Sequence, residues 1–353
     1  MEQEKKKRII KKCKKALIIT LIVIAALAVV AGATYFILRL VGKSHFKPAV
    51  MSAEDVNTIE GASATDGSSI KYNGKVYKPN KDVIYFAFIG VDKETLGTEE
   101  GREHSAGQSD VNMIFAFDTK NGDISFILIP RDTMVDIDIL NSSGDRIGIS
   151  EEQLCLSYAY GDGRERSCEN VLVSMERLLF GIEIDNYYAL DLDGIGVLND
   201  AVGGIELTAL EDIHGSYFYC SKGDRLYLWG NDANIYVRYR DTSVRESDTT
   251  RRQRQIQYAK AFAFKAFEQI KKDSSKVSEI YNAAQDYSCT NFDLSRVTYL
   301  ASVLVDKRAR LTIDNDDIHI LEGEDLGTGD FREIHLDRTK VFETILDVFY
   351  VEE

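Results

Sequence analysis

The longest uninterrupted hydrophobic stretch of the chain lies near its N-terminus. Residues 16–38 contain no charged side chain, and 23 residues of helix at about 1.5 Å each exceed the roughly 30 Å hydrocarbon core of a membrane. A cleavable signal peptide would have a shorter apolar region that ends in small residues. Here the small residues at 31–33 are followed by further apolar ones. We therefore expect a retained transmembrane helix over residues 16–40.

Further along, short apolar runs predict β-strands. Val83–Ile89 is almost wholly apolar and is typical of a strand buried on both faces. Val111–Phe117 and Ile124–Ile129 are two more strands, and the Asn-Gly pair at 121–122 predicts a tight turn between antiparallel partners. A second Asn-Gly pair predicts a hairpin over Ile70–Tyr77.

Helix-like and strand-like segments then alternate, which favours a central sheet covered by helices. The predicted helices are Ser150–Tyr160, Ser167–Phe180, Gly194–Val202 and Asp248–Lys272, and the predicted strands are Ile184–Leu190, Ile205–Thr208 and Ile235–Val237. Residues 44–69 have weak propensities, so 41–79 are expected to form a stalk and the hairpin. One domain is expected over 80–353, with its core at 80–270. Residues 290–353 are expected to close that domain rather than form a second module.

Charge divides the chain at the apolar run. The first 15 residues carry eight Lys or Arg against two Glu, or +6, which leaves −20 for the rest of a chain of formal net charge −14. By the positive-inside rule, residues 1–15 are a cytoplasmic tail and the domain is extracellular, a single-pass type II arrangement in the cell membrane. So acidic a domain is not expected to bind nucleic acid, and any anion must be held in a local pocket.

Four of the five cysteines follow the apolar run, where disulfides are permitted. They are Cys155, Cys168, Cys220 and Cys289. Two disulfides with three possible pairings are compatible with this number, and so are four buried thiols.

Charged side chains lie beside several predicted strand ends, where α/β folds place their sites. Asp92 follows the first strand of the domain, and Asp110 opens the second. Arg131 and Asp132 come directly after Pro130, which ends the third. Each is typical of an ordinary turn when taken alone.

The densest group of arginines lies between residues 238 and 255. Arg238 and Arg240 would point to one side of a strand, and Arg251, Arg254 and Gln255 would share one face of a helix. The planar guanidinium binds phosphate through paired hydrogen bonds and stays charged. The two surfaces could close on one anionic group. The alternative is a solvated face whose arginines pair with nearby acids.

These segments resemble the LytR-CpsA-Psr family of cell-wall proteins over about residues 80–270. The matching segments are Ile89-Gly90-Val91-Asp92, Ser109-Asp110-Val111-Asn112-Met113, Ile129-Pro130-Arg131-Asp132-Thr133, and Val237-Arg238-Tyr239-Arg240 with Asp248-x-x-Arg251-x-x-Arg254-Gln255. The single N-terminal anchor also fits the family. One position departs from it, because the family often has an arginine before the Ser-Asp pair and this chain has Gln108.

The resemblance implies an α/β/α sandwich with a central mixed sheet that binds a polyprenyl-linked pyrophosphate. It implies a phosphotransferase that moves a glycopolymer, such as teichoic acid or capsule, from an undecaprenyl pyrophosphate carrier to peptidoglycan through a phosphodiester bond. Mg²⁺ would be bound by Asp92 and Asp110, since this ion prefers carboxylate, phosphate and water oxygens.

The resemblance also assigns the remaining motif residues. Asp110, Arg131 and Asp132 are expected at the reacting phosphate, where Asp132 either orients an arginine or acts as the base. Asp248 is expected to orient an arginine. The pyrophosphate site as a whole is expected to comprise Arg131, Arg238, Arg240, Asp248, Arg251, Arg254 and Gln255.

Two other functions are compatible with the same residues. A non-catalytic sensor or scaffold would bind polyprenyl phosphate without turnover, and a lipid pyrophosphatase would hydrolyse it. A serine hydrolase is not indicated, because the chain has no Gly-x-Ser-x-Gly motif.

Overall fold

The computed structural model describes residues 32–65, 68–97, 105–141, 143–215, 217–241, 247–273, 275–306, 317–328 and 331–353. The expected cytoplasmic tail and most of the expected transmembrane helix lie outside these ranges. Residues 32–44 are helical. Within the described ranges, no helix is both long enough and apolar enough to cross a membrane.

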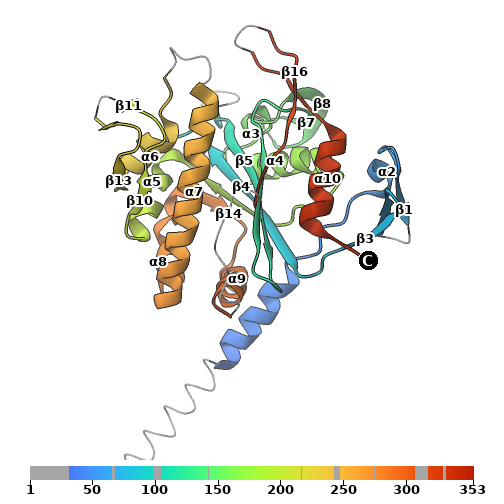
Figure 1. Cartoon of the computed structure of the whole chain (residues 1–353), viewed down its shortest axis with the longest axis horizontal. Coiled ribbons are helices and arrows are strands. Elements are labelled where there is room, and N and C mark those ends of the chain that lie inside the picture. Colours follow the sequence, from blue (N-terminus) through green and yellow to red (C-terminus); the bar gives the residue numbers. More distant parts are fainter. Residues whose placement is uncertain are drawn as a thin grey trace, which may run out of the picture.

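A mixed sheet of six strands forms the centre of the domain (Figure 1), in the order β14-β9-β4-β5-β6-β15. The strands are β4 (Val83–Val91), β5 (Ser109–Asp118), β6 (Ile124–Ile129), β9 (Tyr187–Leu190), β14 (Ser288–Thr290) and β15 (Ile318–Ile320). β4, β5 and β6 run antiparallel in sequence, as the Asn-Gly turn at 121–122 predicts. β9 and β15 run parallel to β4 and β6, so the mixed sheet is confirmed.

β4 is buried on both faces because its side chains alternate between two hydrophobic cores. Tyr85, Ala87 and Ile89 belong to one core, and Ile84 belongs to the other. The first core is closed by three helices, α3 (Leu156–Ala159), α4 (Glu165–Leu178) and α10 (Arg338–Phe349). The second is closed by α7 (Ser247–Lys272) and α9 (Leu294–Asp306). Helices therefore cover both faces of the sheet.

A third hydrophobic cluster lies on the outer side of α7. Its elements are α5 (Leu192–Ala201), β10 (Ile205–Thr208), β11 (Ile213–His214), β12 (Tyr219–Cys220), β13 (Arg225–Leu228), α6 (Asn231–Arg238) and α8 (Lys276–Ala283). The prediction of a strand at 235–237 is wrong, because these residues form the last turn of α6. Tyr236 and Val237 are buried in this cluster, and that packing outweighs their intrinsic preference for strands.

The segment predicted to be a stalk is part of the folded domain. Residues 52–65 form α2 (Ala53–Val56) with its N-cap and strand β1 (Ala62–Thr65), and Met51, Val56 and Ile59 are buried. The predicted hairpin is confirmed as β2 (Ser69–Tyr72) and β3 (Lys75–Pro79). β18 (Tyr350–Glu352) pairs with β3, so both ends of the domain meet in one small sheet.

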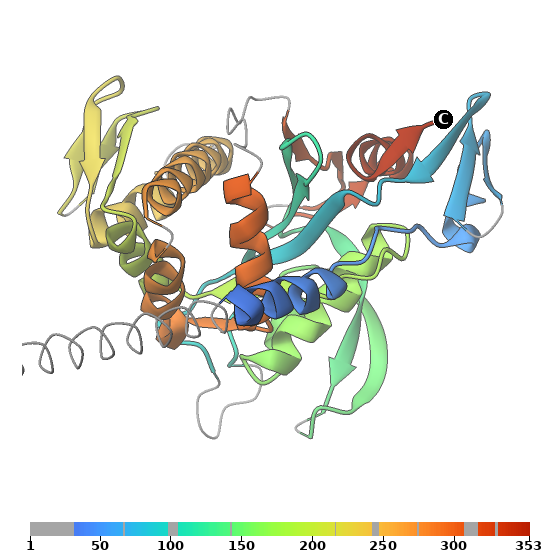
Figure 2. The same cartoon turned by 90° about the horizontal axis from the view of Figure 1, so that it is seen from below.

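The helix at 32–44 packs on the underside of the domain beside α9 (Figure 2). A Cβ at Gly42 would lie 2.0 Å from the carbonyl oxygen of Ser295, so only glycine permits this approach. Phe46, just beyond the helix, places its ring 5.6 Å from that of Tyr299 and 6.4 Å from that of Phe292. These contacts fix where the chain enters the domain.

The pairing of strands shortens one predicted helix and shows where the C-terminal region lies. Residues 150–153 end β8 (Arg146–Gln153), which pairs with β7 (Met134–Leu140), so the helix predicted over Ser150–Tyr160 is confined to α3. The described residues after 290 belong to the same domain, because β15 completes one edge of the central sheet and β18 joins β3. This region also contains the hairpin of β16 (Gly323–Asp325) and β17 (Ile334–Leu336).

The four cysteines after the apolar run are all buried free thiols. Of the two alternatives that the sequence left open, two disulfides or four buried thiols, the structure has the four buried thiols.

Candidate functional site

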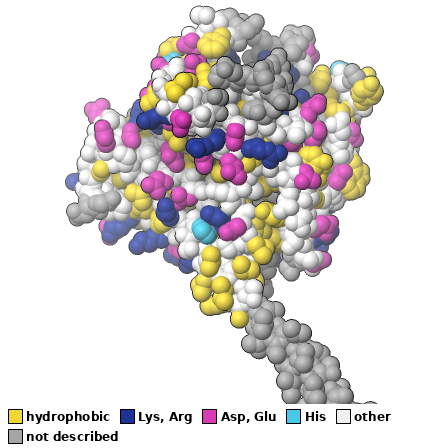
Figure 3. All heavy atoms as spheres, turned by 180° about the vertical axis from the view of Figure 1, so that it is seen from behind, with side chains coloured by type: hydrophobic (Ala, Val, Ile, Leu, Met, Phe, Trp, Pro, Cys, Tyr) yellow, Lys and Arg dark blue, Asp and Glu magenta, His cyan; other side chains and the backbone are white. Residues whose placement is uncertain are grey.

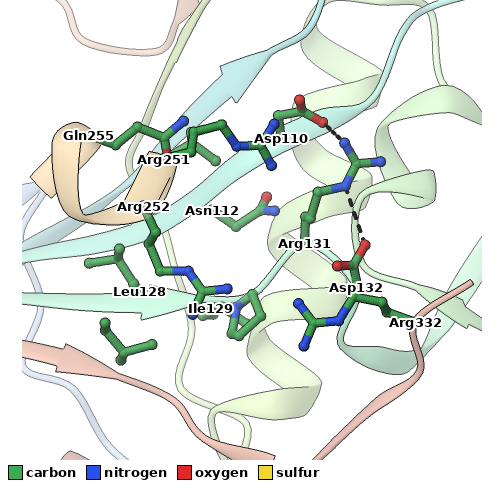
Figure 4. A pocket seen from close by; sticks show the side chains of 13 residues that line it. Asp110, Asn112, Leu128, Ile129, Arg131, Asp132, Arg251, Arg252, Gln255 and Arg332 are labelled. Atoms are coloured by element: carbon green, nitrogen blue, oxygen red, sulfur yellow. Dashed lines mark hydrogen bonds and ion pairs between the residues drawn. The ribbon is translucent and has the colours of Figure 1, made fainter. Parts of the chain in front are cut away.

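A pocket lies where β5 begins and β6 ends, next to the first turns of α7 (Figure 4). Its polar lining comprises Asp110, Asn112, Arg131, Asp132, Arg251, Arg252, Gln255 and Arg332, and its apolar lining comprises Val111, Leu128, Ile129, Pro130 and Ile320. Four arginines against two aspartates make the lining cationic in a protein whose net charge is −14. Such a pocket is suited to an anion.

All three nitrogen atoms of the Arg131 guanidinium group have partners among the described residues. Its Nη1 donates to Asp110 Oδ1, and its Nη2 donates to Gln108 Oε1 and to Cys155 Sγ, the last at 3.4 Å. Its Nε lies 3.4 Å from Asp132 Oδ1. Gln108, the position at which this sequence departs from the family pattern, therefore orients the motif arginine.

Cys155 was not anticipated from the sequence, and its neighbours explain its place in the site. Its backbone N–H donates to the carbonyl of Arg131 at 3.0 Å, and its carbonyl accepts from Ser109 N at 3.2 Å. The residue thus joins the start of β5 to the loop after β6. Burial raises the pKa of the Cys155 thiol to about 11, so at neutral pH the thiol is uncharged and does not neutralise Arg131.

Asp110 is surrounded by the charges that the motifs predict. Burial raises the pKa of its carboxyl group, Arg131 and Arg251 lower it, and Asp92 and Asp132 raise it. The net direction is upward. Electrostatic coupling of this kind requires proximity, so the folded chain brings together five residues that are up to 159 positions apart in sequence.

Three oxygen-bearing side chains near this point match the chemistry of Mg²⁺. Asp92 Oδ1 accepts from Gln108 N at 2.6 Å. Asn112 Nδ2 donates to Ser109 O at 2.8 Å, while its buried Oδ1 finds no hydrogen-bond partner among the residues that the structure describes. In those ranges, no group of three or more His, Cys, Asp or Glu side chains gathers for a metal ion. Asp92, Asp110 and Asn112 Oδ1 are oxygen ligands of the kind that Mg²⁺ accepts beside water and phosphate.

Helix α7 supplies one wall of the pocket. Arg251 and Gln255 line it together, as their i, i+4 spacing predicts. Gln255 Nε2 also donates to the carbonyl of Val237 at 3.4 Å, which ties α7 to the end of α6.

Arg254 does not belong to the pocket, and here the sequence prediction is wrong. Its side chain is 0% exposed; Nη1 and Nη2 donate to the carbonyls of Tyr236 and Tyr239, and Nε pairs with Glu211 Oε1 at 2.7 Å. Carbonyls at a helix end lack donors within the helix, so Arg254 caps α6. Successive side chains of a helix are rotated by about 100° around its axis. Viewed along α7, Gln255 therefore lies some 40° from Arg251 in one direction, and Arg254 lies some 60° from Arg251 in the other direction, toward α6.

The remaining predicted residues lie elsewhere or outside the described residues. Arg238 ends α6 and Arg240 follows it, both with exposed side chains, and the described lining of the pocket does not include them. They follow a helix rather than a strand, so the strand-end argument does not apply to them. The side chain of Asp248 is outside the described residues.

Sequence analysis also missed three lining residues. Asn112 could have been found, because it lies two positions after Asp110 on β5 and side chains two apart on a strand point to the same side. Arg252 was passed over because it lies outside the motif spacing. Arg332 carries no sequence signal, since it reaches the pocket only because the segment before β17 lies against the loop at 131–133.

The chain is similar to known proteins both in sequence and in fold. The sequence is 27% identical over 202 residues to the polyisoprenyl-teichoic acid–peptidoglycan teichoic acid transferase TagV of Bacillus subtilis, covering 55% of this chain and 46% of that protein. It is 28% identical over 165 residues to the TagU transferase of Halalkalibacterium halodurans, covering 47% and 49%. The chain thus spans about half the length of these curated relatives.

The crystal structure of B. subtilis TagV superposes with a TM-score of 0.56 at 23% identity, covering 76% of this chain and 96% of that one. This likeness establishes the fold. The sequence model of the LytR_cpsA_psr family matches residues 49–328, which is most of the chain. The protein therefore belongs to the LytR_cpsA_psr family.

Proposed function

We propose that this protein transfers a teichoic acid or a similar glycopolymer from an undecaprenyl pyrophosphate carrier to peptidoglycan through a phosphodiester bond. The names of the relatives, polyisoprenyl-teichoic acid–peptidoglycan teichoic acid transferases, support this class of reaction. The observation that carries the proposal is the composition of the pocket, where Arg131, Arg251, Asp110 and Asp132 converge from three distant segments.

The arginines bind the diphosphate in this proposal. A diphosphate diester carries about two negative charges, and charged hydrogen bonds from guanidinium groups match its oxygens in pairs. Burial alone would lower the pKa of Arg131, but the carboxylates of Asp110 and Asp132 raise it, so the group stays cationic. Arg251 and Gln255 approach from α7. Arg238 and Arg240, exposed at the end of α6, are candidates for contacts with the substrate outside the pocket.

The reaction is a displacement at phosphorus. The 6-hydroxyl of a muramic acid residue forms a new O–P bond to the phosphate that carries the glycan, the bridging P–O bond breaks, and polyprenyl phosphate leaves. The hydroxyl proton passes to a carboxylate of the pocket. Asp132, 3.4 Å from Arg131 Nε, either orients that arginine or is the carboxylate that takes the proton. Mg²⁺, held by Asp92 and Asp110, would stabilise the charge that develops on the phosphates.

The proposed location is the outer side of the cell membrane, with a type II orientation. The helix at 32–44 supports it, because Tyr35, Phe36, Ile37 and Leu40 are 47–60% exposed. Figure 3 shows hydrophobic side chains gathered at this end of the molecule, while charged ones are spread over the rest of that face. An apolar end of this kind suits a surface that lies next to lipid.

The test incubates the purified protein with a lipid-pyrophosphate glycan, Mg²⁺ and peptidoglycan fragments, and detects joined product by mass spectrometry. Asp110→Asn keeps the shape of the side chain but removes its charge, so turnover should fall by about 100-fold or more while the lipid still binds. Asp347→Asn, on the exposed face of α10, is the matched control and should react like the wild type. Hydrolysis without transfer would identify a pyrophosphatase instead, and binding without reaction would identify a sensor or scaffold.

A further inference from the structure

We propose that Arg252 and Arg332 form a second anion subsite in the pocket, which selects a lipid-linked donor whose first sugars carry an acidic group. The group is an oxyanion, either a phosphate or a carboxylate. This inference rests on the proposed function and adds the chemical class of the transferred glycan to it.

Arg332 reaches the pocket from a segment beyond the residues that the family model matches, which end at 328. Its own carbonyl accepts from Gln153 Nε2 at 2.7 Å. Two residues later, Ile334 N donates to the carbonyl of Asp132 at 3.0 Å, and Ile334 forms a parallel bridge with the buried Thr133. The backbone that carries Arg332 is therefore fixed to the loop that carries Asp132.

The direction of the Arg332 side chain is also fixed. Its Nε donates to Asp325 Oδ2 at 2.8 Å, and Asp325 Oδ1 accepts from the backbone of Gly327 and Glu333. The bond from Arg332 is the largest of the causes that lower the pKa of Asp325. Asp325 is not among the residues that line the pocket, whereas Arg332 is. The carboxylate thus holds the arginine from outside while the guanidinium faces the pocket.

Arg252 comes from the opposite wall. It directly follows Arg251 on α7, and consecutive helical side chains diverge by about 100°. Figure 4 shows the result, with Arg251 directed toward Asp110 and Arg252 directed toward the part of the pocket near Ile129 and Arg332. Arg251 and Arg252 thus face different parts of the pocket, and Arg332 lies beside Asp132.

An additional anion is the ligand that this part of the pocket would take. Arg332 keeps Asp325 as its partner through Nε, which leaves its Nη atoms to donate elsewhere. Guanidinium groups that line one pocket from two walls can bind one oxyanion through charged hydrogen bonds. Arg251 and Arg252 line the same pocket, so the subsite lies next to the diphosphate position. The sugars nearest the diphosphate are covalently held there, which favours a group on the donor.

The experiment measures the affinity of the full-length protein in detergent for three synthetic donors. All carry the same polyprenyl pyrophosphate, joined to a neutral disaccharide, a disaccharide with a hexuronate, or a disaccharide with a phosphate. The wild type should bind at least one acidic donor about tenfold more tightly than the neutral one, as expected for one or two charged hydrogen bonds. The acidic donor that binds more tightly shows whether the subsite takes a carboxylate or a phosphate.

The variants Arg252→Gln and Arg332→Gln should each abolish this preference: each should weaken binding of the acidic donor by about tenfold more than binding of the neutral donor, whose diphosphate also loses a nearby positive charge. Arg332→Lys, which keeps the charge but not the paired donors, should retain part of it. Arg166→Gln, an exposed arginine on α4 outside the pocket lining, is the matched control. Equal losses for acidic and neutral donors would overturn the subsite. Equal wild-type affinity for all three donors would overturn it while the proposed function stands, and failure to bind any donor would overturn both.

Discussion

Replacing Arg254 by alanine should destabilise the domain without removing a phosphate contact. The fully buried guanidinium donates to the carbonyls of Tyr236 and Tyr239 and pairs with Glu211 at 2.7 Å. It also lies 5.6 and 5.5 Å from the ring centroids of the same two tyrosines. Alanine removes all of these partners at once, at the point where α6 ends.

The size of the effect follows from what is left behind. Removing one partner of a buried ion pair costs about 3–5 kcal/mol. The Glu211 side chain is 26% exposed, so water compensates part of its loss. The two carbonyls cost about 1–3 kcal/mol each when they lose their donors. Taking the low end of each range, we expect a loss of at least about 5 kcal/mol in the free energy of unfolding. With an unfolding entropy of about 0.6 kcal/mol/K for a domain of about 300 residues, the Tm falls by at least about 8 °C.

The assay compares thermal unfolding with binding of polyprenyl pyrophosphate for variants of one helix. Arg254→Ala should lower the Tm, and Arg254→Lys should lower it less because the ammonium group still reaches one acceptor. Arg251→Ala is the matched comparison, since it lines the pocket and is only partly buried. It should weaken binding by about tenfold or more and change the Tm little. An Arg254→Ala protein that melts like the wild type, yet loses binding as strongly as Arg251→Ala, would refute the capping role.

Two other predictions concern stability at different pH values and topology. Burial raises the pKa of Asp191, the N-cap of α5, to about 6 from 3.8, so its protonated form stabilises the fold below about pH 3.8 and this contribution is lost as the pH rises through 6. The Asp191→Asn variant mimics the protonated group and still caps the helix. In urea denaturation its free energy of unfolding should exceed that of the wild type by about 2–3 kcal/mol at pH 7.5 and by much less at pH 4.5. A variant as stable as the wild type at both pH values would contradict the argument. Protease added to intact protoplasts should digest residues beyond about 45, and a protected domain would contradict the type II orientation.

The sequence by itself determined the parts of this protein that depend on local patterns. Strands β4, β5 and β6 follow from short apolar runs, and the turn between β5 and β6 follows from an Asn-Gly pair. The resemblance of the segments beside those strands to the LytR_cpsA_psr pattern placed Asp110 and Arg131 in one site, and the two side chains are in contact in the structure. Helical spacing was enough to place Arg251 and Gln255 on one wall.

Tertiary structure decided what those patterns leave open. Residues 235–237 have a strand-like sequence, yet they form a helix because Tyr236 and Val237 are buried against neighbouring elements. Spacing alone grouped Arg254 with Arg251, and only the position of α6 on one flank of α7 makes the first a cap and the second a pocket residue. Arg332 reaches Asp132 across 200 positions through backbone contacts that no local motif encodes. Periodicity fixes the face of an element on which a side chain lies, whereas its partner depends on which distant surface packs against that face.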